Sequence, residues 1–194
     1  QTNYCTMTMT MTMTTMTRFY WHCLFFSCAL VVMGVNGLNI AITGSSQGIG
    51  LDAAKRLIAD GHTVYHACRS RERADVAVRG AGGGVPMVCD LADLRSVKEF
   101  ARALKRDVPQ LDVLCLNAGI APSTKATAPR LTKDGFEECI GVNHLGHFLL
   151  ANLLKGHLSE DGGGCLVTTA SSVHDPEGPG GNVGGRGGAT LGDL

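Results

Sequence analysis

The sequence lacks an excess of charge of either sign. Its 194 residues include 17 lysines and arginines against 17 aspartates and glutamates, so the formal net charge is zero. Proteins that hold nucleic acid through its phosphates need a strongly basic surface. We therefore expect no nucleic-acid partner.

The sequence also lacks the cysteine spacing of a disulfide framework or a zinc site. None of its eight cysteines forms a Cys-x-x-Cys pair or has a histidine at zinc spacing. His144 and His147 lie three apart on one predicted helix face, but no third ligand accompanies them, so we expect no metal site. Four cysteines in or at the end of short apolar runs are expected to be buried free thiols. These are Cys68, Cys89, Cys115 and Cys165.

The first 37 residues differ in composition from the rest of the chain. Residues 6–17 alternate Met and Thr almost without interruption, and no matching segment is available to pair with them as a strand. We expect this run to be disordered or a translation artefact. Residues 19–35 are mostly apolar and follow Arg18, which resembles a signal peptide or a short membrane anchor. The alternative is an extra helix packed on a domain formed by residues 38–194.

The two ends of the chain predict a fragment. The sequence begins at Gln1 rather than at Met, and it stops at Leu194 inside a glycine-rich stretch. No helical or strand pattern closes that stretch. We therefore expect a domain that is incomplete at its C-terminus.

From Leu38 onward, short apolar runs alternate with amphipathic stretches. The runs predict buried strands at residues 38–43, 63–68, 85–89, 111–116 and 165–169. Helical spacing is present at residues 49–58, 94–104 and 136–148, and less clearly at 71–78. This alternation predicts an α/β fold with a doubly wound parallel sheet, whose ligands bind beyond the carboxyl ends of the strands.

A glycine-rich segment leaves the first predicted strand and opens the first predicted helix. It reads Thr43-Gly44-Ser45-Ser46-Gln47-Gly48-Ile49-Gly50. Gly44 permits a sharp turn, Gly48 lets the backbone approach a pyrophosphate, and Gly50 lets the helix pack closely on the strand. The helix N-terminus adds N–H groups and positive potential. The segment therefore predicts a dinucleotide site that contains every residue from Gly44 to Gly50.

An arginine follows the second predicted strand, at the position that contacts the cofactor ribose in dinucleotide-binding folds. An acidic side chain there would accept hydrogen bonds from the ribose of NAD, whereas a guanidinium matches a 2′-phosphate. Arg69 therefore indicates NADPH as the cofactor. Arg71 and Arg73 are weaker candidates, with a solvated helix start as the alternative. Asp90 follows the third strand and is placed for the adenine amino group, with Leu91 beside it.

Two more motifs follow later strands at the same expected edge of the sheet. They are Asn117-Ala118-Gly119 after the fourth strand and Ser171-Ser172 after the fifth. Together with the glycine-rich segment they resemble the short-chain dehydrogenase/reductase family, and the resemblance covers nearly everything from Leu38 onward. It implies a Rossmann-type oxidoreductase that binds a nicotinamide cofactor and a small-molecule substrate.

The resemblance also implies roles for individual residues. Asn117, Ala118 and Gly119 would support the central sheet and line the cofactor site. Asn143 would orient a water in a proton relay, and Ser172 would polarise the substrate. Both polar side chains suit such work, because a polar group on an apolar helix surface needs a partner and a hydroxyl at a strand end can donate to an oxygen.

Two branches of the family compete for the substrate assignment. Residues 141–148 resemble retinol-dehydrogenase-type enzymes and, equally, light-dependent protochlorophyllide oxidoreductases. The segments 129–137, 181–183 and 189–194 resemble the second branch, which implies reduction of a tetrapyrrole C=C bond in chlorophyll biosynthesis, in a plastid. Residues 171–174 resemble the retinol branch, which implies an alcohol or carbonyl substrate at the endoplasmic reticulum membrane. We favour the protochlorophyllide branch.

The family's Tyr-x-x-x-Lys motif is missing downstream of the serine. No tyrosine follows Tyr65, and no lysine follows Lys155. Without the phenol a proton source is lacking, and without the ammonium nothing lowers the pKa of that phenol. We expect the full-length protein to be the enzyme and this chain alone to be inactive. An alternative of another class is a truncated, non-catalytic dinucleotide-binding protein.

Overall fold

The structure, a computed structural model, describes residues 7–9, 37–121, 128–158 and 164–171. The chain divides into two compact units, one of residues 1–6 and 37–168 and the other of residues 7–36 and 169–194. Strand β1 (Met7–Met9) belongs to the second unit. The expectation that the Met-Thr run forms no strand is wrong for these three residues, since β-branched threonine at every second position favours an extended backbone.

The anchor-like segment, residues 19–35, lies outside the described residues. Within the described ranges, no helix combines the length and the apolar character needed to cross a bilayer.

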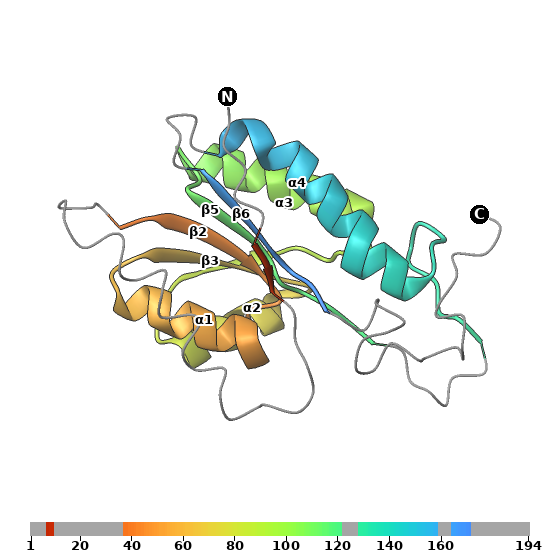
Figure 1. Cartoon of the computed structure of the whole chain (residues 1–194), viewed down its shortest axis with the longest axis horizontal. Coiled ribbons are helices and arrows are strands. Elements are labelled where there is room, and N and C mark those ends of the chain that lie inside the picture. The colour runs from red at the N-terminus through yellow and green to blue at the C-terminus, as the bar shows by residue number, and fades with distance from the viewer. Residues whose placement is uncertain (1–6, 10–36, 122–127, 159–163, 172–194) are drawn as a thin grey trace. The chain divides into compact units, whose positions relative to one another are not determined.

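Five parallel strands of the first unit form its sheet. They are β2 (Asn39–Thr43), β3 (Thr63–Cys68), β4 (Val85–Val88), β5 (Val113–Leu116) and β6 (Cys165–Thr169). They lie in the order β6-β5-β2-β3-β4 (Figure 1). All five predicted strands are confirmed, although β5 begins two residues late because Leu111 makes only an isolated bridge with Leu158.

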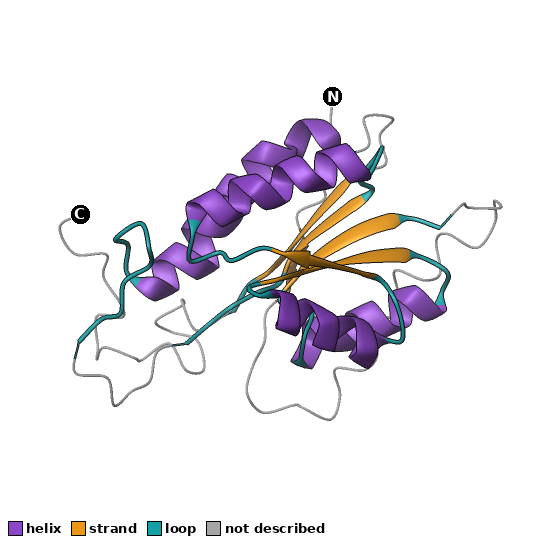
Figure 2. Ribbon diagram, turned by 180° about the vertical axis from the view of Figure 1, so that it is seen from behind, coloured by secondary structure: helices purple, strands orange, loops and turns teal. Residues whose placement is uncertain are grey.

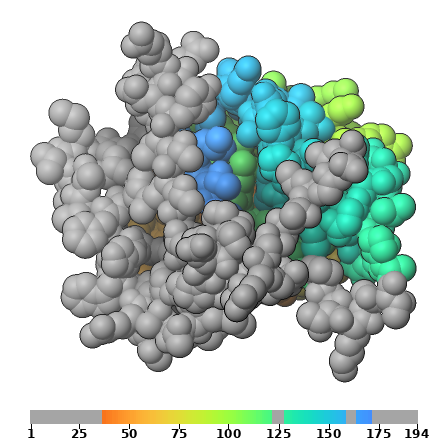
Figure 3. Space-filling view, turned by 45° about the vertical axis from the view of Figure 1, so that its right-hand side comes forward, coloured from red at the N-terminus to blue at the C-terminus, as the bar shows by residue number. Residues whose placement is uncertain are grey.

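Helices cover both faces of this sheet. Helices α1 (Gly48–Ala59) and α2 (Arg71–Ala81) lie on one face, and α3 (Leu94–Asp107) and α4 (His147–Leu154) lie on the other (Figures 1 and 2). In the space-filling view, α3 and α4 lie next to each other on the surface (Figure 3). The predicted α/β fold with a parallel, doubly wound sheet is confirmed.

The helix predicted over residues 136–148 begins later and is not regular. Leu131 and Glu137 form an antiparallel bridge, and Gly135 between them has a φ of +85°. Residues Ile140–Gly146 then form a π-helix, η3, which continues directly into α4. A 3₁₀ turn, η4 (Lys155–His157), ends this helical segment. The apolar period correctly predicts a helical segment here, but it does not register the turn that the positive φ of Gly135 makes.

The two largest hydrophobic clusters, one on each face, hold the layers together. Leu104 of α3, Leu114 of β5 and Leu150 of α4 are fully buried in the larger cluster. The smaller cluster joins β2 to α1 and includes Ile42 and Ala54. Alternate residues of the buried strands therefore face opposite clusters, as a sheet covered on both sides requires.

No disulfide joins the described cysteines. Cys68 and Cys89 are buried as expected, whereas Cys115 and Cys165 are only partly buried. Burial raises the pKa of Cys89 and of Cys115 to about 12. These side chains therefore stay neutral at physiological pH and act as packing residues.

The strand order reverses direction beside β2. From β2 the chain proceeds to β3 and β4 on one side, and it then returns to β5 on the other side. In open α/β sheets the crevice at such a reversal, outside the carboxyl ends of the strands, is where ligands bind. Here that place lies between the segments that follow Thr43 and Leu116.

Candidate functional site

The turn after β2 packs directly on the segment after β5. Gly44 has a φ of +68°, and a Cβ there would lie 2.8 Å from the Cα of Ala118. A Cβ at Gly50 would lie 2.5 Å from the Asn117 Nδ2 atom. Neither position has room for a side chain. Gly50 therefore lets the start of α1 pack against Asn117, in the segment after β5. The sequence predicts close packing at Gly50, but against the preceding strand.

Gly48 has the opposite surroundings. Its φ is +55°, and a Cβ built there would meet no atom within 4 Å. Gln47, Gly48 and Ile49 are exposed, whereas Ser45 is buried and Ser46 is half-buried. The backbone at Gly48 is consequently bare on its outer side, and a ligand can approach it closely.

The N-terminus of α1 has no side-chain cap. Gln47, at the cap position, makes no capping hydrogen bond, and the first turn contains no acidic residue. The N-termini of α2 and α3 differ, since Ser70 and Asp93 cap them. The first N–H groups of a helix have no partner inside it, and together with the helix dipole they favour an anion. The α1 end beside the glycine turn is therefore suited to a phosphate group.

The Thr43 hydroxyl joins the two segments at the strand reversal. Its Oγ1 accepts hydrogen bonds from the backbone N–H groups of Asn117, at 2.9 Å, and Ala118, at 3.0 Å. The Asn117 Nδ2 group donates in return to the Thr43 carbonyl at 3.0 Å. Thr43 is 1% exposed, so these bonds are shielded from water. They fix the glycine turn against the Asn117–Gly119 segment.

Asn143 lies in the middle of η3 and clamps it to the same segment. Its Oδ1 accepts from the Ile120 N–H, and its Nδ2 donates to the Ile120 carbonyl, both at 2.8 Å. Gly119 lies beside this clamp, since a Cβ there would be 3.8 Å from Asn143 Oδ1. Both ends of the Asn143 amide are thus used in holding the backbone. Ser172, the other predicted catalytic residue, lies outside the described residues, and the exposed Ser171 is the last described residue before it.

The three arginines beyond β3 have different surroundings. Arg69 is exposed directly after the strand. Arg73 Nη1 donates to the Gln47 Oε1 atom at 3.2 Å, so this side chain lies against the glycine turn. Arg71 instead pairs with Asp75 on α2 at 3.0 Å. Arg73 therefore contacts the glycine turn, whereas Arg71 is engaged on α2.

Asp90 and Leu91 follow β4 at the same edge of the sheet. The Asp90 Oδ1 atom accepts from the Ala92 N–H at 3.1 Å, so one carboxylate oxygen is already engaged. The Leu91 side chain is buried in the larger core cluster. The Leu91 carbonyl packs closely on the end of η3, since a Cβ built at Gly146 would lie only 2.7 Å from its oxygen. Leu91 can therefore present only its backbone to a ligand.

Two buried histidines also belong to this site, although the sequence motifs identify neither of them as a residue of the cofactor site. His66 on β3 contacts Ser45, and His147 at the start of α4 contacts Thr43. Burial lowers the pKa of both imidazoles below the ordinary histidine value. A polar residue within an apolar strand or helix run was the available signal. Within the described ranges, no three histidine, cysteine or carboxylate side chains gather as a metal site would require.

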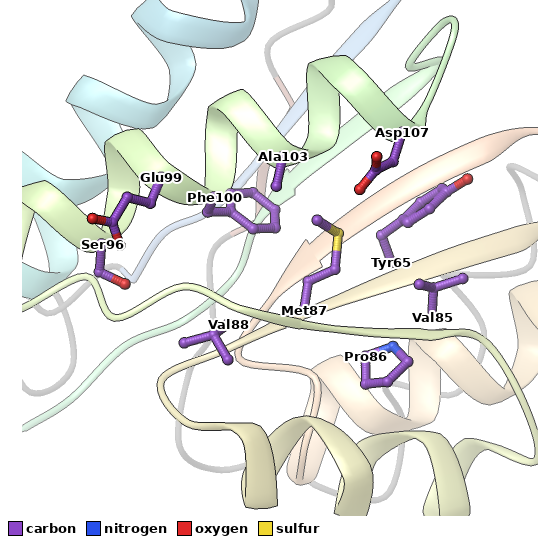
Figure 4. Close-up of a pocket in the computed structure, with 10 residues that line it drawn as sticks. All are labelled: Tyr65, Val85, Pro86, Met87, Val88, Ser96, Glu99, Phe100, Ala103 and Asp107. Atoms are coloured by element: carbon purple, nitrogen blue, oxygen red, sulfur yellow. The ribbon is translucent and has the colours of Figure 1, made fainter.

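A separate hollow of about 360 Å³ lies between α3 and the edge strand β4 (Figure 4). Tyr65, Met87 and Phe100 form much of its apolar wall, and Glu99 and Asp107 add carboxylates. Burial raises the pKa of Tyr65, and the nearby Asp107 raises it further. None of the predicted site residues lines this hollow, so it is distinct from the edge where the glycine turn lies.

Comparison with protein families matches residues 38–183 to the family model described as short chain dehydrogenase. Mouse retinol dehydrogenase 14 is 39% identical over 158 residues, which cover 72% of this chain and 46% of that protein. Barley protochlorophyllide reductase A, a chloroplastic protein, is 43% identical over 163 residues, covering 80% of this chain and 41% of that protein. The chain thus spans less than half the length of these relatives.

A solved structure from the same comparison is also similar to this chain. The alcohol dehydrogenase of the archaeon Thermococcus sibiricus, solved in complex with 5-hydroxy-NADP, superimposes with a TM-score of 0.59 at 28% identity. The match covers 73% of this chain and 61% of that one.

Replacing Gly48 by alanine tests the bare backbone at the turn. Gly48→Ala should lower the free energy of unfolding by only about 1–2 kcal/mol, the cost of a left-handed backbone with a side chain. If the turn holds a dinucleotide, the variant should weaken that binding at least about tenfold, because the new Cβ would stand where a pyrophosphate would approach. Fluorescence titration with NADPH and urea unfolding measure the two effects.

Gly61→Ala is the matched control. Gly61 also has a positive φ and open space around its Cβ position, but it lies at the far end of α1. It should cost similar stability and leave NADPH affinity unchanged. Equal affinities for the two variants would contradict the assignment of Gly48.

Proposed function

Because the chain belongs to the short-chain dehydrogenase/reductase family, we propose that it is the cofactor-binding part of an NADPH-dependent oxidoreductase. The observation that carries this proposal is the glycine turn at the strand reversal. There the bare backbone at Gly48 adjoins the uncapped N-terminus of α1. These groups offer N–H donors and positive potential to a pyrophosphate, with no side chain in the way.

Two arginines beyond β3 support NADPH over NADH. Arg69 is exposed at the end of β3, and Arg73 is tied to the turn through Gln47. A 2′-phosphate between two guanidinium groups would accept charge-assisted hydrogen bonds from both. Asp90 keeps one carboxylate oxygen that the Ala92 bond does not use, and this suits the adenine amino group. When bound, the reduced nicotinamide supplies a hydride.

Residues of the β5 and η3 segments would position the reacting groups. Asn117 and Ala118 hold the turn through Thr43, and Asn143 holds the Gly119–Ile120 backbone. We assign the polarising hydroxyl to Ser172 from the family resemblance. The chain contains no Tyr-x-x-x-Lys after that serine, so we expect it to bind NADPH without turning substrate over. A purely regulatory, non-catalytic role is the alternative that predicts the same behaviour.

For the substrate we favour protochlorophyllide. The match to the barley protochlorophyllide reductase is more identical and covers more of this chain than the match to the mouse retinol dehydrogenase. Reduction of a tetrapyrrole C=C bond in a plastid follows from this assignment. The retinol dehydrogenase relatives favour a second candidate, oxidation or reduction of an alcohol or carbonyl at the endoplasmic reticulum membrane, with residues 19–35 as the anchor.

Arg69→Ala tests the choice of cofactor. The unsubstituted chain should bind NADPH about tenfold or more tightly than NADH, and the variant should lose most of that preference together with a charge-assisted bond to the 2′-phosphate. Arg102→Ala removes the same charge from the exposed side of α3 and should preserve the preference. Equal affinity of the unsubstituted chain for NADPH and NADH would contradict the role of Arg69.

The substrate is tested in a protein that joins this chain to a Tyr-x-x-x-Lys segment. Absorbance is recorded with NADPH and protochlorophyllide in darkness and after a flash, and in parallel with NADPH and retinal. Conversion of protochlorophyllide only after the flash is the expected result. Conversion of retinal in darkness, with no change in the tetrapyrrole, would move the assignment to the retinol dehydrogenase branch.

A further inference from the structure

Two buried histidines reach the glycine turn from opposite faces of the sheet. His66 is fully buried on β3, where it lies in register with Ile42, on the face covered by α1 and α2. His147 is 6% exposed at the start of α4, on the other face. Their contacts are with Ser45 and Thr43, the two hydroxyl residues that flank Gly44.

The hydrogen bonds of His66 determine which of its nitrogens carries the proton. Its Nε2 lies 3.0 Å from the Gly83 carbonyl, which can only accept, so Nε2 is the N–H group. The neutral ring then has an unprotonated Nδ1, which accepts from the Ser45 hydroxyl at 2.9 Å. His66 therefore links the turn to the segment between α2 and β4.

The hydrogen bonds of His147 require the opposite tautomer. Its Nδ1 lies 3.1 Å from the Asn143 carbonyl and must donate to it. Its Nε2 lies 2.9 Å from Thr43 Oγ1, whose two lone pairs already accept from Asn117 and Ala118. The Thr43 hydroxyl therefore donates to Nε2 in preference to the Cys115 carbonyl, which lies farther away at 3.4 Å.

We propose that His66 and His147 are positioning residues that hold the glycine turn from both faces, and that the turn binds the dinucleotide only while both imidazoles are neutral. This inference rests on the proposed NADPH-binding function. Protonated His147 would direct Nε2–H at an oxygen with no lone pair left, which forces the ring and the Thr43 hydroxyl apart. Protonated His66 could no longer accept from Ser45, whose hydroxyl would have to turn its proton toward Cys68 Sγ, at 3.9 Å, and accept from Nδ1–H. Each protonation therefore breaks the arrangement of hydrogen bonds that holds the turn.

The surrounding groups determine the direction of the pH effect. Burial lowers the pKa of both histidines, although their hydrogen bonds to the Gly83 and Asn143 carbonyls oppose this effect. The charge of His144 on η3 lowers the pKa of His147 further. On the other face, Cys68 also contacts Ser45, and burial raises the pKa of its thiol, although the bond with Ser45 and the charge of Arg73 on α2 oppose this effect. Both histidines are thus neutral at pH 7, and protons are added only as the pH falls through pKa values below about 6.5.

This mechanism predicts the opposite trend from direct electrostatics. An imidazolium near the pyrophosphate would attract it, so a histidine that contacts the ligand would strengthen binding in acid. Positioning by neutral histidines predicts weaker binding in acid. The 2′-phosphate of NADPH also titrates in this range, so the comparison must be made between variants that share the same ligand.

The test uses the 194-residue chain, with NADPH affinity measured by fluorescence at about pH 7.5 and about pH 5.0. His66→Asn and His147→Gln keep an acceptor for the hydroxyl but cannot take up a proton. The affinity of the combined variant at the higher pH is its own reference, so that the change in affinity between the two pH values is what is compared. Between the two pH values, the affinity of the unsubstituted chain should fall about tenfold more than that of the combined variant.

His144→Gln is the matched control, because His144 is an exposed histidine on the same helical segment. Because it removes a charge that lowers the pKa of His147, it should move the loss of affinity to a slightly higher pH but leave that loss as large as in the unsubstituted chain. ¹⁵N NMR of the histidine rings should show His66 as the Nε2–H tautomer and His147 as the Nδ1–H tautomer at about pH 7.5.

The outcomes separate this inference from the function on which it rests. If the unsubstituted chain binds no NADPH at about pH 7.5, the proposed function is wrong and the inference falls with it. If it binds NADPH and has the same pH profile as the combined variant, the inference alone is wrong. Ring tautomers other than those expected would also overturn it, and that readout requires no ligand.

Discussion

The Thr43 hydroxyl is saturated with hydrogen bonds, and the arrangement of the site depends on it. One oxygen accepts from two consecutive N–H groups, at Asn117 and Ala118, and lies within hydrogen-bond distance of the His147 ring. A buried polar atom is costly unless it is paired, so each of these partners restricts where the others can lie. Strand β2, the segment after β5 and helix α4 therefore meet at one atom.

This restriction explains why the turn needs glycine at different positions for two different reasons. At Gly44 and Gly50 the neighbours leave no room for a Cβ, because the Thr43 bonds draw the β5 segment against the turn. At Gly48 the surroundings are empty, and glycine is needed for the positive φ and for access by a ligand. The turn therefore packs tightly where it meets the β5 segment and leaves its backbone bare at Gly48, and both features follow from the same local geometry.

Much of the fold could be predicted from the sequence because apolar runs and helical periods report burial directly. The sheet and the helices α1, α2 and α3 are examples, and the glycine spacing located the turn. The irregular segment that precedes α4 could not be predicted. Its turn at Gly135 and its π-helix depend on local backbone geometry, which apolar periodicity does not register. His66 and His147 were missed as site residues, because their roles arise from contacts between residues far apart in the chain.

The central claim is that the turn held by Thr43 binds a pyrophosphate while the end of β3 binds a 2′-phosphate. ³¹P NMR of NADP⁺ resolves these phosphates, so titration with this chain tests both contacts in one experiment. We expect the pyrophosphate and the 2′-phosphate resonances both to shift or broaden, and only the 2′-phosphate effect to be lost in Arg69→Ala. Pyrophosphate resonances that stay unchanged at saturating protein would contradict the account.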